Sequence, residues 1–377
     1  MAKFDDLRKF MDDSISRLGL SGIDCIVHQD YKEIFRHTSG YGNMEEKTPI
    51  PPKSIHNIYS ATKVITCVAA LQLLERGQFL LTDPLYSYMP EYKDMLVKTG
   101  TFHIFPAKNH IRIFDLFAMT SGISYDRDTP AFEKLNKETN GDFSSRDFMR
   151  IYAETPLLHE PGEGWNYGYS HDVLSVLIEV VSGMTFDEYL KKNIFGPLGM
   201  NDAYFYLPEE KRSRRIPQYA YNPVDGSVTR GTDECLGQAG KRHDSGGGGL
   251  IMTGEDYMLF ADALSCGGVG ANGERIISKR SIDLMSQNHL VGPQLEGFKK
   301  VAMPPGNGYG LGVTVCVDPT TNKSLTPKGQ FGWGGIGGVQ CSFNTELRLS
   351  YYVVQHLFAS PKHLIQPHMM NILFANL

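Results

Sequence analysis

The stretch from Asn57 to Gln78, NIYSATKVITCVAALQLLERGQ, constrains the fold of this chain more than any other part of its sequence. After Lys63 it is apolar around most of the circumference of a helix, and a helix of that kind is buried. We therefore predict a buried helix that begins at Ser60, ends near Gly77 and encloses the Lys63 side chain at least in part.

Ser60 and Lys63 are three residues apart, so a helix places them on the same face. Burial and the positive end of the helix both disfavour an ammonium group there, and an amine that releases its proton easily can accept one from a serine hydroxyl. Backbone N–H groups at the same helix end point at developing negative charge. Ser60 could instead be an N-cap and Lys63 an exposed residue, but the buried context favours a nucleophile and its base.

The remaining pattern predicts an α+β fold. Helices are expected at residues 4–18 and from Pro361 onward, strands follow the first helix and precede the last, and the middle of the chain is mainly helical. A chain of 377 residues exceeds one ordinary core. We expect an antiparallel sheet domain, residues 1–80 and 207–377, flanked by the terminal helices, with an inserted helical domain, residues 81–206, and the active site between them.

Composition excludes several classes of function. The net charge of -5 argues against a nucleic-acid surface, and no apolar run is long enough to span a membrane. The charged N-terminus lacks the apolar core of a secretory signal, so we expect a cytoplasmic protein. No P-loop or HExxH motif occurs and no GxGxxG opens a helix, so we expect neither cofactor nor metal. The scattered cysteines are expected to be reduced and mostly buried: Cys25, Cys67, Cys235, Cys266, Cys316 and Cys341.

The sequence YSATK, followed by an apolar helix, resembles the superfamily of serine β-lactamases and penicillin-binding proteins. The resemblance covers nearly the whole chain and implies the β-lactamase/transpeptidase fold. Within the superfamily the chain is most similar to family VIII carboxylesterases. The segments that carry the resemblance are MTSGISY at 119–125, EPGEGWNYGYSHDVLSVLIEVVSG at 160–183, FGPLGM at 195–200, SGGGGLIMTGEDYMLFADALSCGG at 245–268 and FGWGGIGG at 331–338.

This resemblance implies a catalytic tyrosine at the mouth of a helix, and two tyrosines compete for that role. A helix that starts near Asp172 favours Tyr167, which the lysine amine would help to act as a general base. Tyr169 would then be a half-buried aromatic residue that lines the pocket.

The segment Trp333-Gly334-Gly335 stands where β-lactamases have Lys-Thr-Gly. By the resemblance, the N–H of Ile336 forms the oxyanion hole together with the N–H of Ser60. Trp333, Gly334 and Gly335 would contact the substrate, and Trp165 is suited to be a wall of an apolar acyl pocket. The missing lysine, and the missing asparagine of the Tyr-x-Asn motif, remove groups that would bind a β-lactam.

We therefore expect a serine hydrolase that cleaves carboxylic esters through an acyl-enzyme on Ser60, with Lys63 and Tyr167 as proton carriers. The expected partner is a small-molecule ester or a β-lactam, and the oligomeric state is left open. A β-lactamase or D-Ala-D-Ala peptidase, an acyltransferase, and a binding protein without catalysis are the alternatives. The α/β-hydrolase class is disfavoured because G-x-S-x-G does not occur.

Overall fold

The computed structural model describes residues 3–100, 103–231, 239–301 and 304–377. Within these residues the main sheet has eight strands in the order β11-β12-β13-β14-β15-β1-β2-β3, and its neighbouring strands are antiparallel. β1 (Gly22–Gln29) pairs with β15 (Leu349–Val354), so the first long strand lies beside the last one. The predicted α+β class, with one antiparallel sheet built from both ends of the chain, is confirmed.

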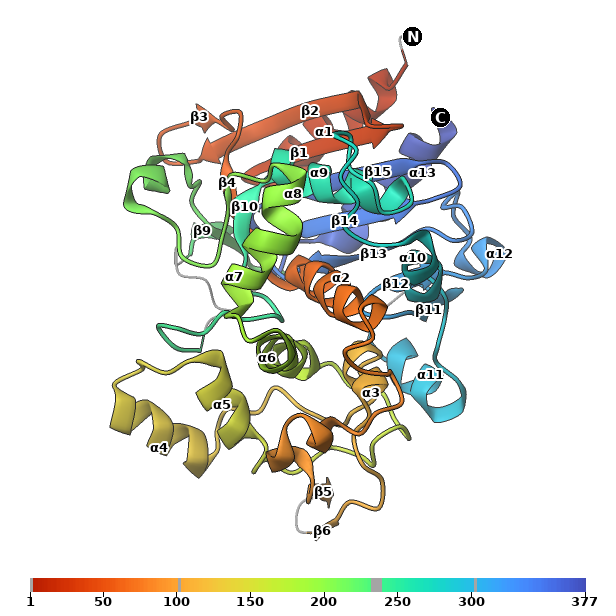
Figure 1. Cartoon of the computed structure of the whole chain (residues 1–377). Coiled ribbons are helices and arrows are strands. Elements are labelled where there is room, and N and C mark those ends of the chain that lie inside the picture. Colours follow the sequence, from red (N-terminus) through yellow and green to blue (C-terminus); the bar gives the residue numbers. More distant parts are fainter. Residues whose placement is uncertain (1–2, 101–102, 232–238, 302–303) are drawn as a thin grey trace.

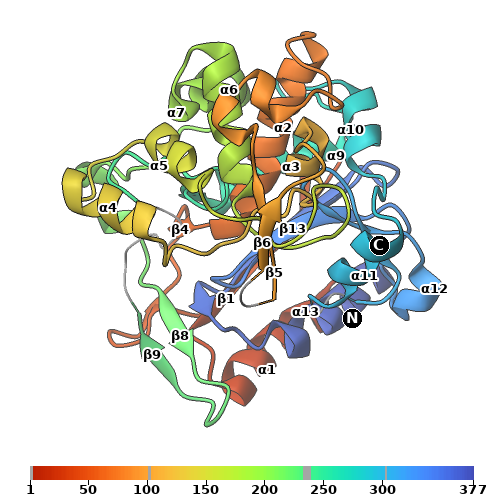
Figure 2. The same ribbon diagram turned by 90° about the horizontal axis from the view of Figure 1, so that it is seen from below.

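The sheet is covered on both faces, which explains why β1 is buried over most of its length. Cys25 and Val27 belong to the apolar cluster that contains residues of α1 (Asp5–Leu18) and α13 (Lys362–Ala375). Ile26 points the other way, as alternation along a strand requires, and joins the larger core. Figure 2 shows the sheet between the α1–α13 pair and the group of helices that contains α2, α3 and α6.

The buried helix of the opening motif is α2 (Thr62–Glu75), whose residues from Thr62 to Leu73 are all buried. It begins two residues later than predicted, because Ser60 lies in a preceding 3₁₀ turn, η1 (Tyr59–Ala61). It ends two residues before Gly77, which adopts the left-handed conformation of a helix stop with φ 67°. Figure 1 shows α2 at the centre of the molecule, between the sheet and the helices of the middle of the chain.

The middle of the chain packs several helices around α6 (Ser170–Ser182), which contacts α2, α3, α5 and α7. This helix begins at Ser170, two residues before the start expected near Asp172. Sequence patterns predict helix N-caps at Ser145 and Thr185. Thr185 is a cap, since its side chain accepts a hydrogen bond from the N–H of Glu188. The other cap is Ser144, one residue before the prediction, and it accepts from the N–H of Asp147.

The second half of the chain supplies most of the sheet. The segment YGLGVTVCV, expected to be one strand, forms two strands, β11 and β12, around Gly312 with φ 80°. The hairpin expected around Asp225-Gly226 is present as β8 and β9. The segment that contains Trp333 is strand β13.

Bounds of the helices are as follows: α1 Asp5–Leu18, η1 Tyr59–Ala61, α2 Thr62–Glu75, η2 Leu85–Ser87, η3 Pro90–Tyr92, α3 Ile113–Phe117, α4 Pro130–Thr139, α5 Ser145–Tyr152, α6 Ser170–Ser182, α7 Phe186–Leu190, the π-helix η4 Lys191–Phe195, α8 Gly196–Leu198, η5 Glu209–Arg214, α9 Gly254–Ser265, α10 Lys279–Met285, α11 Gly292–Lys299, α12 Pro319–Asn322 and α13 Lys362–Ala375. Bounds of the strands are β1 Gly22–Gln29, β2 Lys32–Asn43, β3 Thr48–Pro49, β4 Ile55–Asn57, β5 Leu96–Thr99, β6 His103–Pro106, β7 Ala203–Tyr204, β8 Tyr219–Tyr221, β9 Val228–Arg230, β10 Ile251–Thr253, β11 Asn307–Tyr309, β12 Thr314–Cys316, β13 Phe331–Gly335, β14 Val339–Asn344, β15 Leu349–Val354 and β16 Leu357–Phe358.

Five of the cysteines are buried free thiols: Cys25, Cys67, Cys266, Cys316 and Cys341. Cys235 lies outside the described residues. In the part of the chain that the structure describes, no helix is both long enough and apolar enough to span a membrane.

Candidate active site

Ser60 lies in a backbone turn that its neighbours hold in place. The preceding residue, Tyr59, has a positive φ of 47°, which is strained for a residue with a bulky side chain. Its hydroxyl accepts a hydrogen bond from Asn57 Nδ2 at 3.1 Å and donates one to Gln218 Oε1 at 3.2 Å. These contacts fix the Tyr59 ring, and with it the turn that presents the half-buried Ser60.

Lys63 is fully buried, as the apolar surroundings in the sequence predict. Its Nζ donates to three acceptors: Ser60 Oγ at 3.3 Å, the Tyr125 hydroxyl at 3.0 Å and the carbonyl oxygen of Gly247 at 2.5 Å. The amine therefore lies in contact with the serine hydroxyl, and its other two hydrogen bonds fix its position.

The carbonyl oxygen of Gly247 is itself held by the loop Ser245–Gly249, which packs on the first turns of α2. Buried Asp172 on α6 accepts hydrogen bonds from Ser245 Oγ at 2.5 Å and from the N–H of Gly247 at 3.2 Å. Thr66 donates to the carbonyl of Gly246 at 2.7 Å. A Cβ at position 247 would lie only 2.2 Å from Asp172 Oδ2, so only glycine fits here.

Tyr167 also lies beside the amine, with Lys63 Nζ 4.6 Å from the centre of its ring. Its hydroxyl accepts a hydrogen bond from Trp333 Nε1 at 3.1 Å. The structure therefore brings together Ser60, Lys63, Tyr167 and Trp333 from four separate elements.

Tyr169 lies elsewhere, directly before α6. It is 2% exposed, its ring packs against Phe148 and Tyr152, and its hydroxyl accepts a hydrogen bond from Arg127. Burial raises the pKa of the Tyr169 phenol well above the ordinary value. The phenol therefore keeps its proton and is not available as a base. Tyr169 was expected to line the pocket; in the structure its ring packs against that of Tyr125, with the centroids 4.6 Å apart.

Tyr125 is the residue that the sequence interpretation left without a role, although it belongs to the segment MTSGISY. The residue is 40% exposed, but its hydroxyl lies against the buried amine of Lys63. Burial of the hydroxyl, together with the neighbouring Tyr167, raises its pKa well above 10. Tyr125 is therefore suited to keep its proton and to position the amine.

The two tryptophans form one wall of the cluster. Trp333 packs against Tyr167, with centroids 5.6 Å apart, and edge-on against Tyr309 at 5.4 Å. Trp165 stacks on Tyr167 at 6.4 Å and contacts Phe298 at 5.1 Å. Trp165 is only 5% exposed, so it supports the wall from behind.

The end of β13 passes close to η1 because its residues are glycines. A Cβ on Gly335 would lie 2.3 Å from the carbonyl oxygen of Ile58, and one on Gly337 would lie 2.6 Å from the Tyr59 ring. Gly334, between Trp333 and Gly335, is half-buried. Ile336, between the two contacting glycines, has its side chain 65% exposed. Its backbone thus lies beside the Ser60 turn.

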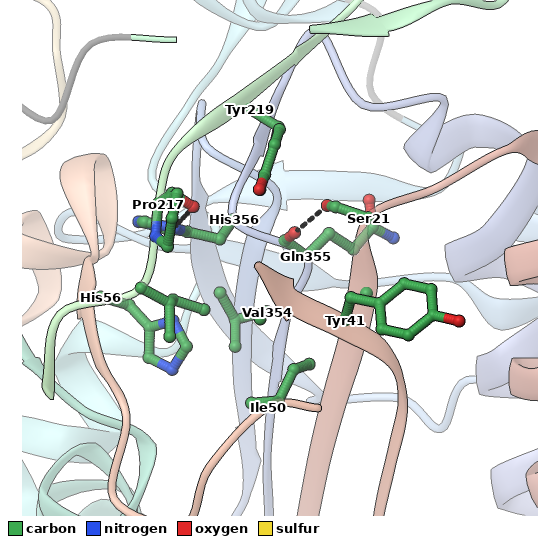
Figure 3. Close-up of a pocket in the computed structure, with 12 residues that line it drawn as sticks. Ser21, Tyr41, Ile50, His56, Pro217, Tyr219, Val354, Gln355 and His356 are labelled. Atoms are coloured by element: carbon green, nitrogen blue, oxygen red, sulfur yellow. Dashed lines mark hydrogen bonds between the residues drawn. The ribbon is translucent and has the colours of Figure 1, made fainter. Parts of the chain in front are cut away.

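Two other features lie away from Ser60. His171 is fully buried behind Cys67 with Nε2 3.6 Å from its Sγ, and burial lowers its pKa to about 3. A separate cavity of about 10 Å³, the size of one water molecule, lies between β1, β15 and the segment around Pro217 (Figure 3). The unpartnered Nδ1 of His56 lies at this cavity.

Among the described residues, no group of three or more His, Cys, Asp or Glu side chains is arranged to hold a metal ion. The chemistry available at Ser60 is that of a hydroxyl beside an amine, two phenols and the backbone of a glycine-rich strand. Such a group can transfer a proton from a hydroxyl and stabilise an oxyanion.

Comparisons with known proteins agree with this geometry. The β-lactamase family model matches residues 6–366. Lovastatin esterase of Penicillium rubens is 31% identical over 303 residues, which are 77% of this chain and 71% of the esterase. Protein Rv1367c of Mycobacterium tuberculosis is 28% identical over 355 residues, 89% of this chain and 86% of that protein.

The fold is also that of solved structures. The structure of EstCE1, described as a hydrolase with promiscuous acyltransferase activity, superposes with a TM-score of 0.80 at 20% identity. The match covers 98% of this chain and 97% of EstCE1. The expected β-lactamase/transpeptidase fold is thereby confirmed.

Proposed function

The chain belongs to the β-lactamase family, and on that basis we propose that it is a carboxylesterase that works through an acyl-enzyme on Ser60. The contact between Lys63 Nζ and Ser60 Oγ, 3.3 Å long and at a buried amine, is the observation that carries the proposal. The similarity to an esterase over 77% of the chain supports the ester as substrate class.

In the proposed mechanism, Ser60 Oγ attacks the ester carbonyl while its proton passes to Lys63. A neutral amine has two N–H groups and one lone pair. In the proposed neutral form, the two N–H groups stay on the Gly247 carbonyl and the Tyr125 hydroxyl, and the lone pair replaces the N–H directed at Ser60 Oγ. The ammonium so formed, with Tyr167 at its side, returns the proton to the leaving alcohol. Water, activated by the same pair, then hydrolyses the acyl-enzyme.

We assign the oxyanion hole to the backbone N–H groups of Ser60 and Ile336. The support for this assignment is the close approach of the glycine-rich end of β13 to the Ser60 turn. Donors fixed in the backbone need no reorganisation when charge develops, which makes them effective in this role.

An apolar ester fits the site better than a β-lactam. Trp333 stands where β-lactamases carry a lysine, and the exposed faces of Ile336 and Tyr125 add apolar surface near Ser60. Acyl transfer to an alcohol other than water is the second candidate, since EstCE1 is described as having that activity as well.

A panel of substrates tests the proposal. We expect the protein to hydrolyse p-nitrophenyl butyrate with a kcat/KM at least about 100-fold above that for a chromogenic cephalosporin, and to be labelled by a fluorophosphonate. Adding a primary alcohol at high concentration and measuring the new ester separates transfer from hydrolysis. A protein that turns over neither substrate and takes no label would refute the proposed function.

The roles of the two tyrosines can be separated by removing one hydroxyl at a time. We expect Tyr167→Phe to lower kcat/KM for p-nitrophenyl butyrate by about 100-fold, because a proton carrier is lost. Tyr169→Phe should keep the rate within about threefold and lower the free energy of unfolding by about 1 kcal/mol, because only the bond from Arg127 is lost. The reverse pattern of rates would assign catalysis to Tyr169.

A further inference from the structure

A larger cavity, of about 480 Å³, lies apart from the catalytic cluster. One side is formed by the segment that follows β7 and continues into η5, and the other by residues 239–241 and β10. Its volume is in the range of sites for small molecules. The described residues that line it are Gly141, Phe205, Tyr206, Leu207, Arg212, Arg215, Ala239, Gly240, Lys241 and Ile251.

The cavity is positively charged. Three of its described lining residues are cations, Arg212, Arg215 and Lys241. No described lining residue is an Asp or Glu. Arg212 pairs with Glu209 at 2.9 Å on the exposed rim. Within the described parts of the chain, Arg215 and Lys241 have no carboxylate within ion-pair distance. An anion entering the cavity therefore meets two uncompensated positive charges.

Arg215 gives a more specific indication of a ligand. Its Nη2 donates to Asn57 Oδ1 at 3.0 Å, which fixes the plane of the guanidinium. Its Nε is buried and has no hydrogen-bond partner in the structure. The Arg215 side chain lines the cavity, and a carboxylate is the acceptor whose shape matches the edge of a guanidinium.

The rest of the lining defines the body of the ligand. Phe205, Leu207 and Ile251 are apolar, and Tyr206 adds its ring. The Tyr206 hydroxyl interacts with the carboxyl of Asp244, whose pKa burial raises to about 6. Together with the cations Arg215 and Lys241, this apolar lining suits a carboxylate on an apolar body.

Two backbone segments link this separate cavity to the catalytic cluster. Ile251 pairs with Asn57, three residues before Ser60, and Phe205 lies against Gly249 of the loop that bonds Lys63. We propose that this cavity binds the carboxylate of a small amphipathic organic acid. The carboxylate can belong to the far end of an ester substrate or to a free acid.

Binding measurements test the pocket without any turnover. By isothermal titration calorimetry we expect hexanoate to bind at least about tenfold more tightly than hexanol. Arg215→Gln should weaken hexanoate binding roughly tenfold, and the exposed Lys241→Gln roughly threefold. Arg280→Gln, an exposed charge change on α10 outside the cavity, is the matched control and should bind as the wild type does. Equal binding of hexanol, or unchanged hexanoate affinity in both cavity variants, would overturn the proposal.

Kinetic measurements distinguish the two sources of the carboxylate. If it is part of the substrate, mono-p-nitrophenyl adipate should be preferred over p-nitrophenyl butyrate by about tenfold, and Lys241→Gln and Arg215→Gln should reduce that preference. If it is a free acid, hexanoate should alter turnover of the butyrate ester in the wild type and less so in these variants. If the butyrate ester is turned over but the enzyme neither prefers the adipate ester nor responds to hexanoate, the proposed carboxylate pocket is refuted and the proposed function stands. Absence of all turnover refutes the function, while the binding measurements still decide the pocket.

Discussion

Replacing Ser60 with alanine is expected to lower kcat/KM for p-nitrophenyl butyrate by about 10⁴-fold or more. The hydroxyl is the only proposed nucleophile at the site. Without it, water would have to attack the ester directly with Lys63 as base, which is much slower. Labelling by a fluorophosphonate, followed by intact-protein mass spectrometry, should disappear in the same variant.

The Ser60 side chain is half-buried and small, so the alanine variant should fold as the wild type does. Ser286→Ala, at the end of α10, is a matched control that removes one hydroxyl bonded only to a backbone carbonyl. It should keep both the label and the rate within about twofold. If Ser60→Ala retained ester turnover above a hundredth of the wild-type rate, the nucleophile would have to be another residue.

Lys63→Met is expected to lower kcat for the same ester by about 10³-fold with a smaller effect on KM. Methionine has nearly the volume of the lysine stem, so the fully buried position stays filled while the amine is lost. Proton transfer from Ser60 then has no base, and the Tyr125 hydroxyl and the Gly247 carbonyl lose their shared partner.

Lys192→Met provides the comparison for this variant, because Lys192 is exposed in the helical segment Lys191–Phe195. It should leave kcat unchanged within about twofold. Circular dichroism of both variants separates a catalytic effect from unfolding. A folded Lys63→Met protein with more than a tenth of the wild-type kcat would remove Lys63 from the proposed proton path.

The pair Ser60 and Lys63 could be found from the sequence because the signal is local. Three residues along a helix-like turn bring the side chains together, and the apolar run after Lys63 indicates burial without any knowledge of the fold. The sheet from both chain ends was predictable for a related reason, since strand patterns follow the first helix and precede the last.

The other partners of the amine could not be predicted in this way. The acceptor on Gly247 is a backbone carbonyl, which leaves no mark on the residue type. Its position depends on Asp172, 75 residues away in the sequence. The sequence sign is the run of four glycines in SGGGG, and the 2.2 Å approach to Asp172 explains the glycine at position 247. Tyr125 belongs to the segment MTSGISY, but only the tertiary fold shows that its hydroxyl contacts Lys63.

The choice of Tyr167 over Tyr169 as the catalytic tyrosine depended on where a helix starts. Helix ends are the least certain feature of any sequence pattern. α6 begins at Ser170 and not near Asp172, yet Tyr167 still lies beside Lys63. The sequence did not predict α4 (Pro130–Thr139) or the hairpin of β5 and β6. These are short elements whose exposed positions carry little apolar periodicity.

The pairing of β1 with β15 has a consequence for how the chain folds during its synthesis. The segment 22–29 leaves the ribosome first, but its partner on one side, residues 349–354, emerges only when more than 300 further residues have been made. Until then the apolar side chains of β1 have their other neighbour, β2, but lack α13 and half of the sheet. The nascent chain thus carries an unsatisfied strand edge through most of translation, the state that chaperones recognise and that favours aggregation. Slow synthesis, or loss of the C-terminal segment, should therefore reduce the yield of folded protein strongly, although this segment contains none of the proposed catalytic residues.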